Sequence, residues 1–309
     1  MKKRNYFTLV VATIAFALFL GTLLGCQRRT PPPPPVVIGD APVVSVARLD
    51  MHNPDALVDV PMLAEMIGMP NVVVLDVSPA GRNVIPGAIW IDRSTLYLYQ
   101  DGNMFGPQPV NVTESIFGAN GIGNDTTVII YDDANGMHAA RIFWLFRAMG
   151  HRDVRLLDGG LGAWIASGYP VYNIPAAPGP LVTYTAANNI DALRADLSHV
   201  LYAKDSPEWS LLDVRSQAEW DAGRIPGAIQ LIFPAQFLNE DLTFRSRAEL
   251  EEIFSHIPGD TKLIVYCGGG LRASIAYFAF TEIIGWPQTV LLYDGSWNNY
   301  TWAGAPVEQ

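Results

Sequence analysis

The sequence predicts an α/β protein built from two copies of one unit, each a mostly parallel β-sheet flanked by helices. The same motifs occur twice in the same order: Tyr266 follows Tyr131 by 135 residues, and Asp294 follows Asp158 by 136. A steady offset across several motifs indicates an internal duplication. In both copies short apolar, β-branched runs alternate with amphipathic stretches, which is typical of parallel sheets covered by helices.

The central strand and the following helix can be located in each copy. Val128–Tyr131 and Leu263–Tyr266 are continuous apolar runs, as expected for strands that are covered on both faces. Ala139–Met149 and Ala273–Ile284 have the composition of helices, and a glycine follows each of them. Each copy is therefore expected to place a strand, a turn and a helix in succession.

The residue after each central strand is Asp132 in the first copy and Cys267 in the second. Ligands of such sheets bind at the carboxyl ends of the strands, where both residues fall. The loop that Cys267 opens continues with Gly268, Gly269, Gly270, Leu271 and Arg272. Glycines allow backbone N–H groups to point inward, and N–H groups at the start of a helix stabilise a thiolate. The sequence therefore predicts that Cys267 is a nucleophile.

Such a thiolate supports covalent, two-step chemistry. It can attack the outer sulfur of an anionic donor, become a persulfide, and then pass that sulfur to a thiophilic acceptor. Arg272 adds a positive charge at the far lip of the loop. This chemistry needs no metal and no organic cofactor, and the five histidines show no metal-ligand spacing.

The N-terminus resembles a bacterial lipoprotein signal. Basic residues beginning at Lys2 precede the apolar run Phe7–Leu24, and Cys26 follows shortly after. The resemblance implies a signal peptide over residues 1–25 and lipidation of Cys26, on a protein that faces the periplasm at the cell envelope. Gln27 after the cysteine favours the outer membrane. The alternative is an uncleaved membrane anchor, because the run is about the length that spans a bilayer.

Four segments are expected to follow the signal. Residues 26–42 form a Pro-rich linker, since five consecutive prolines adopt a semi-rigid polyproline II helix. Residues 43–175 and 185–309 form the two domains, and residues 176–184 link them.

The first copy also carries an insertion, Asp92–Gln108, which contains Tyr97, Tyr99 and Phe105. It is interpreted either as a lid over the site of the partner domain or as a solvated loop.

Together the motifs resemble the tandem rhodanese family, which includes thiosulfate and 3-mercaptopyruvate sulfurtransferases. The resemblance covers residues 43–309 and rests on motifs of both copies: Gly150-His151, Leu157–Trp164, Asp213–Arg215, Ile225–Ala228, the Cys267 loop and Tyr293–Trp297. In that family the N-terminal domain lacks the cysteine. This chain follows the pattern, because Asp132 stands where the second copy has Cys267. The resemblance implies a catalytic second domain, and a first domain that forms a wall of the cleft.

The expected function is transfer of sulfane sulfur from thiosulfate, or a related donor, through a Cys267 persulfide. Three alternatives stay open: a 3-mercaptopyruvate sulfurtransferase, a non-catalytic lipid-tethered module that binds sulfur species or a partner, and a Cys-dependent phosphatase. The phosphatase is favoured least. Dual-specificity phosphatases of the same fold place five residues between Cys and Arg, whereas four separate Cys267 from Arg272.

Further substrate contacts are predicted at Arg215, Arg224 and Ser274. Either arginine could reach a sulfonate or carboxylate, or could instead pair with a nearby acid such as Glu219 or Asp221. Ser274 could hydrogen-bond the cysteine sulfur or be an ordinary hydroxyl at a helix start.

The expected partners are a small anionic sulfur donor, a thiophilic acceptor and, through the lipid anchor, a membrane. A net charge of −10 argues against nucleic acid as a partner, because phosphate binding needs a basic face.

Overall fold

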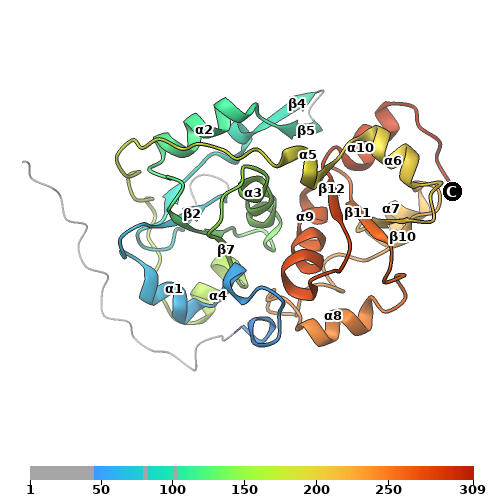
Figure 1. The fold of residues 1–309 in the computed structure, drawn as a ribbon. Helices are drawn as coiled ribbons and strands as arrows, with labels where there is room; N and C mark the ends of the chain where they lie inside the picture. Colours follow the sequence, from blue (N-terminus) through green and yellow to red (C-terminus); the bar gives the residue numbers. More distant parts are fainter. Residues whose placement is uncertain (1–44, 79–82, 101–102) are drawn as a thin grey trace, which may run out of the picture. The chain divides into compact units, whose positions relative to one another are not determined.

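A computed structural model describes residues 45–78, 83–100 and 103–309 (Figure 1). The predicted signal peptide, residues 1–25, and the predicted Pro-rich linker, residues 26–42, lie outside the described residues. Among the helices that are described, none is both long and apolar enough to span a bilayer.

The first sheet has five parallel strands in the order β1-β7-β6-β2-β3 (Figure 1). Its strands are β1 (Leu57–Val58), β2 (Val72–Asp76), β3 (Ile89–Trp90), β6 (Thr127–Tyr131) and β7 (Val154–Leu157). The residues of β6 after Thr127 are fully buried. This confirms the expectation that the central strand is covered on both faces.

The second sheet repeats this topology with the order β8-β12-β11-β9-β10, and all of its neighbours are parallel. Its strands are β8 (Arg194–Ala195), β9 (Trp209–Asp213), β10 (Ile229–Gln230), β11 (Lys262–Tyr266) and β12 (Val290–Tyr293). The duplication read from the sequence is therefore a duplication of strand order, and the predicted α/β fold class is confirmed.

The repeated tyrosines have the same structural role in both halves. The N–H of Ile85 donates to the phenolic oxygen of Tyr131 at 3.0 Å, and the N–H of Ile225 donates to that of Tyr266 at 3.4 Å. Each tyrosine ends a central strand, and each isoleucine opens an Ile-Pro-Gly-Ala turn. The two motifs therefore recur together because one hydrogen bond joins them.

Helices flank both sheets. In the first half they are α1 (Val60–Met66), α2 (Val110–Ala119), α3 (Met137–Ala148) and α4 (Gly160–Ala166), with 3₁₀ turns η1 (Ala47–Leu49), η2 (Pro54–Ala56) and η3 (Arg93–Leu96). In the second half they are α5 (Ile190–Leu193), α6 (Leu197–Ala203), α7 (Gln217–Asp221), α8 (Arg247–Ile253), α9 (Leu271–Phe278), the π-helical segment η4 (Ala279–Ile284) and α10 (Ser296–Trp302). The helix predicted over Ala273–Ile284 is thus α9 continued by η4.

The insertion in the first copy forms η3 and an antiparallel hairpin of β4 (Tyr97–Gln100) and β5 (Asn103–Pro107). Tyr97 is buried, and its ring lies 4.9 Å from the Arg141 guanidinium carbon. Tyr99 is half exposed. The side chain of Phe105 is outside the described part of the chain, so the lid interpretation stays a prediction.

Helices α3 and α9 pack against each other and join the two halves. The rings of Phe143 and Phe278 meet edge to face, with centroids 4.9 Å apart. One apolar cluster includes buried residues of both halves. Because apolar area is removed from water across this contact, the two halves stabilise each other.

Polar contacts reinforce the junction of the two halves. Asp50 accepts hydrogen bonds from the N–H groups of Arg247 and Ala248 at the start of α8, so it caps a helix of the other half. The buried carboxylate of Asp158 accepts from the N–H of Phe244 at 2.9 Å and from the hydroxyl of Ser45. Burial raises the pKa of Asp158 to about 7, although both hydrogen bonds oppose the shift.

This raised pKa predicts how stability depends on pH. An unfolded aspartate loses its proton near pH ~4, whereas folded Asp158 keeps it until about 7. Between these values the folded state binds more protons, so the free energy of unfolding should fall as pH rises and level off above 7. Asp158→Asn removes this decline, which amounts to about 2–4 kcal/mol.

Urea unfolding of the wild type and Asp158→Asn, from pH 4.5 to 8, measures the difference. The exposed Asp125→Asn change is the control and should reproduce the wild-type slope. Parallel curves for the wild type and Asp158→Asn would show that Asp158 is ionised in the folded protein throughout.

Candidate functional site

Cys267 lies directly after β11, at the carboxyl edge of the second sheet, and is buried. Its Sγ accepts a hydrogen bond from the N–H of Gly270 at 3.1 Å. Gly270 is the N-cap of α9, so the sulfur faces the N-terminal end of a helix. Both the N–H donor and the positive end of the helix dipole can interact favourably with negative charge at the sulfur.

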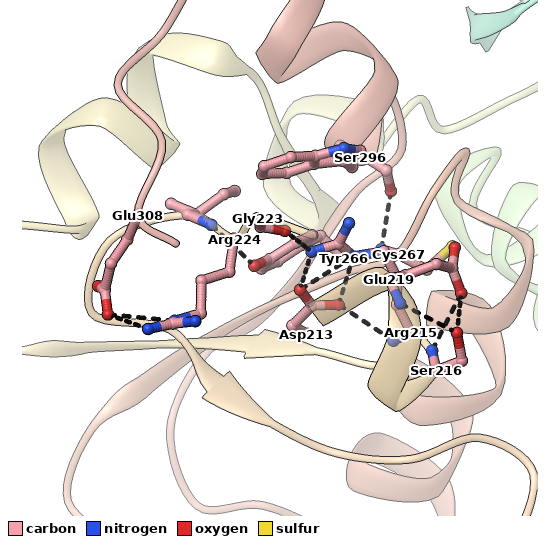
Figure 2. Close-up of polar contacts among 12 residues, drawn as sticks. Asp213, Arg215, Ser216, Glu219, Gly223, Arg224, Tyr266, Cys267, Ser296 and Glu308 are labelled. Carbon is pink, nitrogen blue, oxygen red and sulfur yellow. Dashed lines mark hydrogen bonds and ion pairs between the residues drawn. The ribbon is translucent and has the colours of Figure 1, made fainter. Parts of the chain in front are cut away.

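The segment after β12 holds the cysteine loop in place through three hydrogen bonds. The N–H of Cys267 donates to the hydroxyl oxygen of Ser296 at 3.1 Å, as Figure 2 shows. The N–H groups of Trp297 and Asn298 donate to the carbonyls of Cys267 and Gly268 at 2.9 and 3.0 Å. The start of α10 therefore fixes the loop backbone.

Gly270 occupies a position that only glycine tolerates. Its φ is +87°, and a Cβ there would lie 2.6 Å from the carbonyl oxygen of Asp294. Gly269 is different, because an added Cβ would come no closer than 3.6 Å to Asn298. Of these two glycines, Gly270 is the one required by the fold of the loop.

Arg272 closes the loop one residue into α9, and its guanidinium is bound by a carboxylate. Its two Nη atoms each donate to a Glu219 oxygen at 2.7 Å. This hydrogen bonding is the largest cause that raises the pKa of Arg272, with a further contribution from the Cys267 sulfur. The same pair lowers the pKa of Glu219 to about 2. Both groups are therefore charged at neutral pH.

Arg215 lies in a buried ion pair that Figure 2 shows. Its Nε and Nη2 donate to the carboxylate of Asp213 at 2.6–3.0 Å, and Nη2 also donates to the carbonyl of Gly223. Its guanidinium carbon lies 4.3 Å from the centre of the Trp297 ring. The acid that pairs with Arg215 is thus Asp213 and neither Glu219 nor Asp221, and its role as a substrate contact stays a prediction.

Arg224 and Ser274 are engaged elsewhere. Arg224 pairs with Glu308, as Figure 2 shows. It also donates to the carbonyl of Gln309. Ser274 is buried, and its hydroxyl donates to the carbonyl of Gly270 at 2.8 Å, as a hydroxyl at a helix start commonly does. The serine proton is therefore directed to the backbone and not to the cysteine sulfur.

The equivalent loop of the first half is filled by the side chain of Asp132. One oxygen of the Asp132 carboxylate accepts from the N–H groups of Ala134 and Gly136, and the other accepts from those of His138 and Ala139, all at 2.7–2.9 Å. The cradle of donors at the start of α3 is thus satisfied by the chain itself. This loop therefore has no thiol, and Asp132 already uses four of its N–H groups.

A cavity of about 530 Å³ opens beside the Asp132 loop. Residues of both halves line it, among them Asn135 and Gly160 from the first half and Leu242 and Phe244 from the second. Cys267 is not among its lining residues. The cavity therefore lies beside the first-half loop that corresponds to the Cys267 loop, and the thiol is not part of its lining.

Sequence reasoning missed three features that support the site. Glu219 was considered only as a partner of Arg215 or Arg224, Ser296 was not singled out, and the Arg141–Asp294 pair between the halves was not expected. Ser216 and Glu219 form a capping box, a three-residue spacing that is visible in the sequence. That signal places Glu219 on the first turn of a helix but does not reveal its partner.

The described residues contain no group of three His, Cys, Asp or Glu side chains that could hold a metal ion.

The fold and the site together define a class: a tandem α/β protein with one cysteine loop in its second domain. The Rhodanese-like domain family matches residues 59–167 and 197–303. These matches cover more than half of the chain and fall within the two halves. The chain belongs to the rhodanese family, as a tandem-domain sulfurtransferase.

Curated relatives span most of the chain. A Mycobacterium bovis protein, provisionally named thiosulfate sulfurtransferase 1, is 33% identical over 281 residues, which cover 84% of this chain and 99% of the relative. A provisionally named thiosulfate sulfurtransferase of Haloferax volcanii is 36% identical over 215 residues, covering 63% and 73%. The sulfur carrier protein TtuD of Thermus thermophilus is 35% identical over 209 residues, covering 60% and 72%.

Solved structures share the fold. The anaerobic ergothioneine biosynthesis enzyme of Chlorobium limicola, in complex with trimethyl histidine, superimposes with a TM-score of 0.74 at 23% identity. The match covers 84% of this chain and 71% of that enzyme. At this identity the likeness concerns the architecture alone.

The two loop glycines give a matched test of the site geometry. Gly270→Ala forces an alanine into φ +87° and against the Asp294 carbonyl. It should lower the free energy of unfolding by about 2–3 kcal/mol. It should also slow alkylation of Cys267, because the N–H that faces the sulfur moves. Gly269→Ala should leave both quantities close to wild type.

Thermal unfolding and the rate of Cys267 alkylation by iodoacetamide measure these effects. Equal unfolding temperatures and equal alkylation rates in the two alanine variants would contradict the conclusion that the loop requires Gly270.

Proposed function

We propose that the protein transfers sulfane sulfur from thiosulfate, or a related donor, to a thiophilic acceptor such as cyanide or a thiol. The observation that carries this proposal is the contact between the Cys267 sulfur and the N–H of Gly270 at the start of α9. The relatives named as thiosulfate sulfurtransferases support the choice of donor.

In the first step the Cys267 thiolate attacks the outer sulfur of thiosulfate. A new S–S bond forms at Cys267, the S–S bond of thiosulfate breaks, and sulfite leaves with the electron pair. The product is a Cys267 persulfide anion. The Gly270 N–H and the glycine backbone beside it supply donors for this negative sulfur.

In the second step the acceptor attacks the terminal sulfur. With cyanide, a C–S bond forms as the S–S bond breaks, so that thiocyanate leaves and the Cys267 thiolate is restored. The first domain takes no covalent part, since Asp132 fills the equivalent loop. Its contribution is to pack α3 against α9 and thereby to support the loop.

We expect thiosulfate to add one sulfur atom to Cys267. Intact mass measured before and after incubation should show this gain, and cyanide should remove it. Cys267→Ser should abolish the gain and all turnover while the circular dichroism stays unchanged, because the fold does not depend on the sulfur.

Two results would contradict the proposal. Turnover that persists in Cys267→Ser would exclude a Cys267 persulfide. Failure of both thiosulfate and 3-mercaptopyruvate to load a free thiol would favour a phosphatase or a non-catalytic binding module.

We also propose that the protein is a lipoprotein of the bacterial cell envelope, anchored through Cys26 and facing the periplasm, in the outer membrane. The basic start, the apolar run and Cys26 support this proposal. A lipid on Cys26 and a polyproline spacer would hold the enzyme near the bilayer.

Labelling of growing cells with a fatty-acid analogue tests the anchor. The wild type should incorporate the label and fractionate with outer membranes, and Cys26→Ser should do neither. Label retained by Cys26→Ser would contradict lipidation at this residue.

A further inference from the structure

The pair formed by Glu219 and Arg272 is fixed at the lip of the cysteine loop. Besides its two bonds to Arg272, Glu219 accepts from the N–H of Ser216 at 3.0 Å and from its hydroxyl at 2.7 Å. The capping box of α7 therefore holds the carboxylate before any donor arrives. Hydrogen bonding from Arg272 lowers the pKa of Glu219 to about 2, so the carboxylate is ionised at neutral pH.

The pair lies directly over the residue that follows the nucleophile. A Cβ built on Gly268 would be 3.3 Å from an Arg272 nitrogen and 3.9 Å from a Glu219 oxygen. A donor that approaches the sulfur therefore meets a positive and a negative group together.

Three other guanidiniums described near the loop also contact carboxylates. Arg215 pairs with Asp213 beneath Trp297. Arg141 and Arg194 share the carboxylate of Asp294, whose carbonyl borders Gly270. Arg215 is thus compensated one to one, whereas Arg141 and Arg194 have one carboxylate between them. Backbone N–H groups and the helix end add positive potential at the sulfur.

We propose that Glu219 is a specificity-determining residue: it offsets the charge of Arg272 and so sets how strongly the Cys267 site prefers donors of higher negative charge. A dianion such as thiosulfate is attracted less strongly to this site than it would be to an unpaired guanidinium. Glu219 reduces the attraction of donors with one negative charge, such as organic thiosulfonates and persulfides, less than that of dianions. The inference about donors rests on the proposed sulfur transfer, whereas the charge effect itself does not.

Alkylation of Cys267 in the full chain tests the charge effect without sulfur transfer. Iodoacetate and iodoacetamide form the same C–S bond and release the same iodide, but only iodoacetate carries a negative charge. Rates at Cys267 are read by mass spectrometry of its peptide, so that other residues do not contribute. The measured quantity is the ratio of the iodoacetate rate to the iodoacetamide rate.

Glu219→Gln keeps the size and a hydrogen-bond acceptor but removes the charge. It should raise the ratio by about tenfold at low salt, and by less as salt increases. Arg272→Ala leaves the carboxylate uncompensated and should lower the ratio below wild type. Glu249→Gln is the matched control, because Glu249 fills the same capping-box position beside Ser246 on α8 and is exposed; its ratio should equal that of the wild type.

An unchanged ratio in Glu219→Gln overturns the proposal, as does an equal shift in Glu249→Gln. A loss of both alkylation rates with a constant ratio would show that Glu219 only supports the loop, which also overturns it.

A donor pair extends the test to catalysis. Thiosulfate and methanethiosulfonate both give up an outer sulfur to the thiolate, but they carry two charges and one. Glu219→Gln should raise kcat/KM for thiosulfate relative to methanethiosulfonate by about tenfold. If neither donor loads wild-type Cys267, the proposed sulfur transfer fails, and the alkylation ratio still decides the role of Glu219.

Discussion

The close approach of Gly270 to the Asp294 carbonyl is the constraint on which the site depends. Because no side chain fits there, the loop after β11 can turn tightly enough to direct the Gly270 N–H at the Cys267 sulfur. The same contact brings the start of α10 against the loop, where Ser296 and its two successors hold the loop backbone. A thiolate site thus results from backbone packing more than from charged side chains.

Asp294 also connects this constraint to the first domain. Its buried carboxylate binds Arg141 from α3 at 3.2 Å and Arg194 from β8 at 3.0 Å. With the packing of α3 on α9, this pairing makes the first half part of the support of the Cys267 loop. A buried ion pair is costly to break on one side only, so the two halves are held in one arrangement.

The two halves share one topology, but a different side chain fills the loop after the central strand in each half. Both place a cradle of N–H groups after the central strand, and both begin a helix at a glycine with positive φ. In the first half the Asp132 carboxylate occupies the cradle permanently. In the second half the Cys267 sulfur accepts a hydrogen bond from the N–H of Gly270. The same loop can also accommodate a sulfur atom transferred to Cys267. The Asp132 loop is therefore filled by its own side chain, whereas the Cys267 loop contains a thiol.

The sequence by itself determined the duplication, the α/β class, the central strands and the cysteine loop, because apolar periodicity and glycine placement are local properties. Only the tertiary structure decided which charges meet. Arg272 pairs with Glu219, Arg215 with Asp213 and Arg224 with Glu308, and these partners are separated by 53, 2 and 84 residues. Ion pairing depends on distance in space, and side chains remote along the chain become neighbours only when sheets and helices pack.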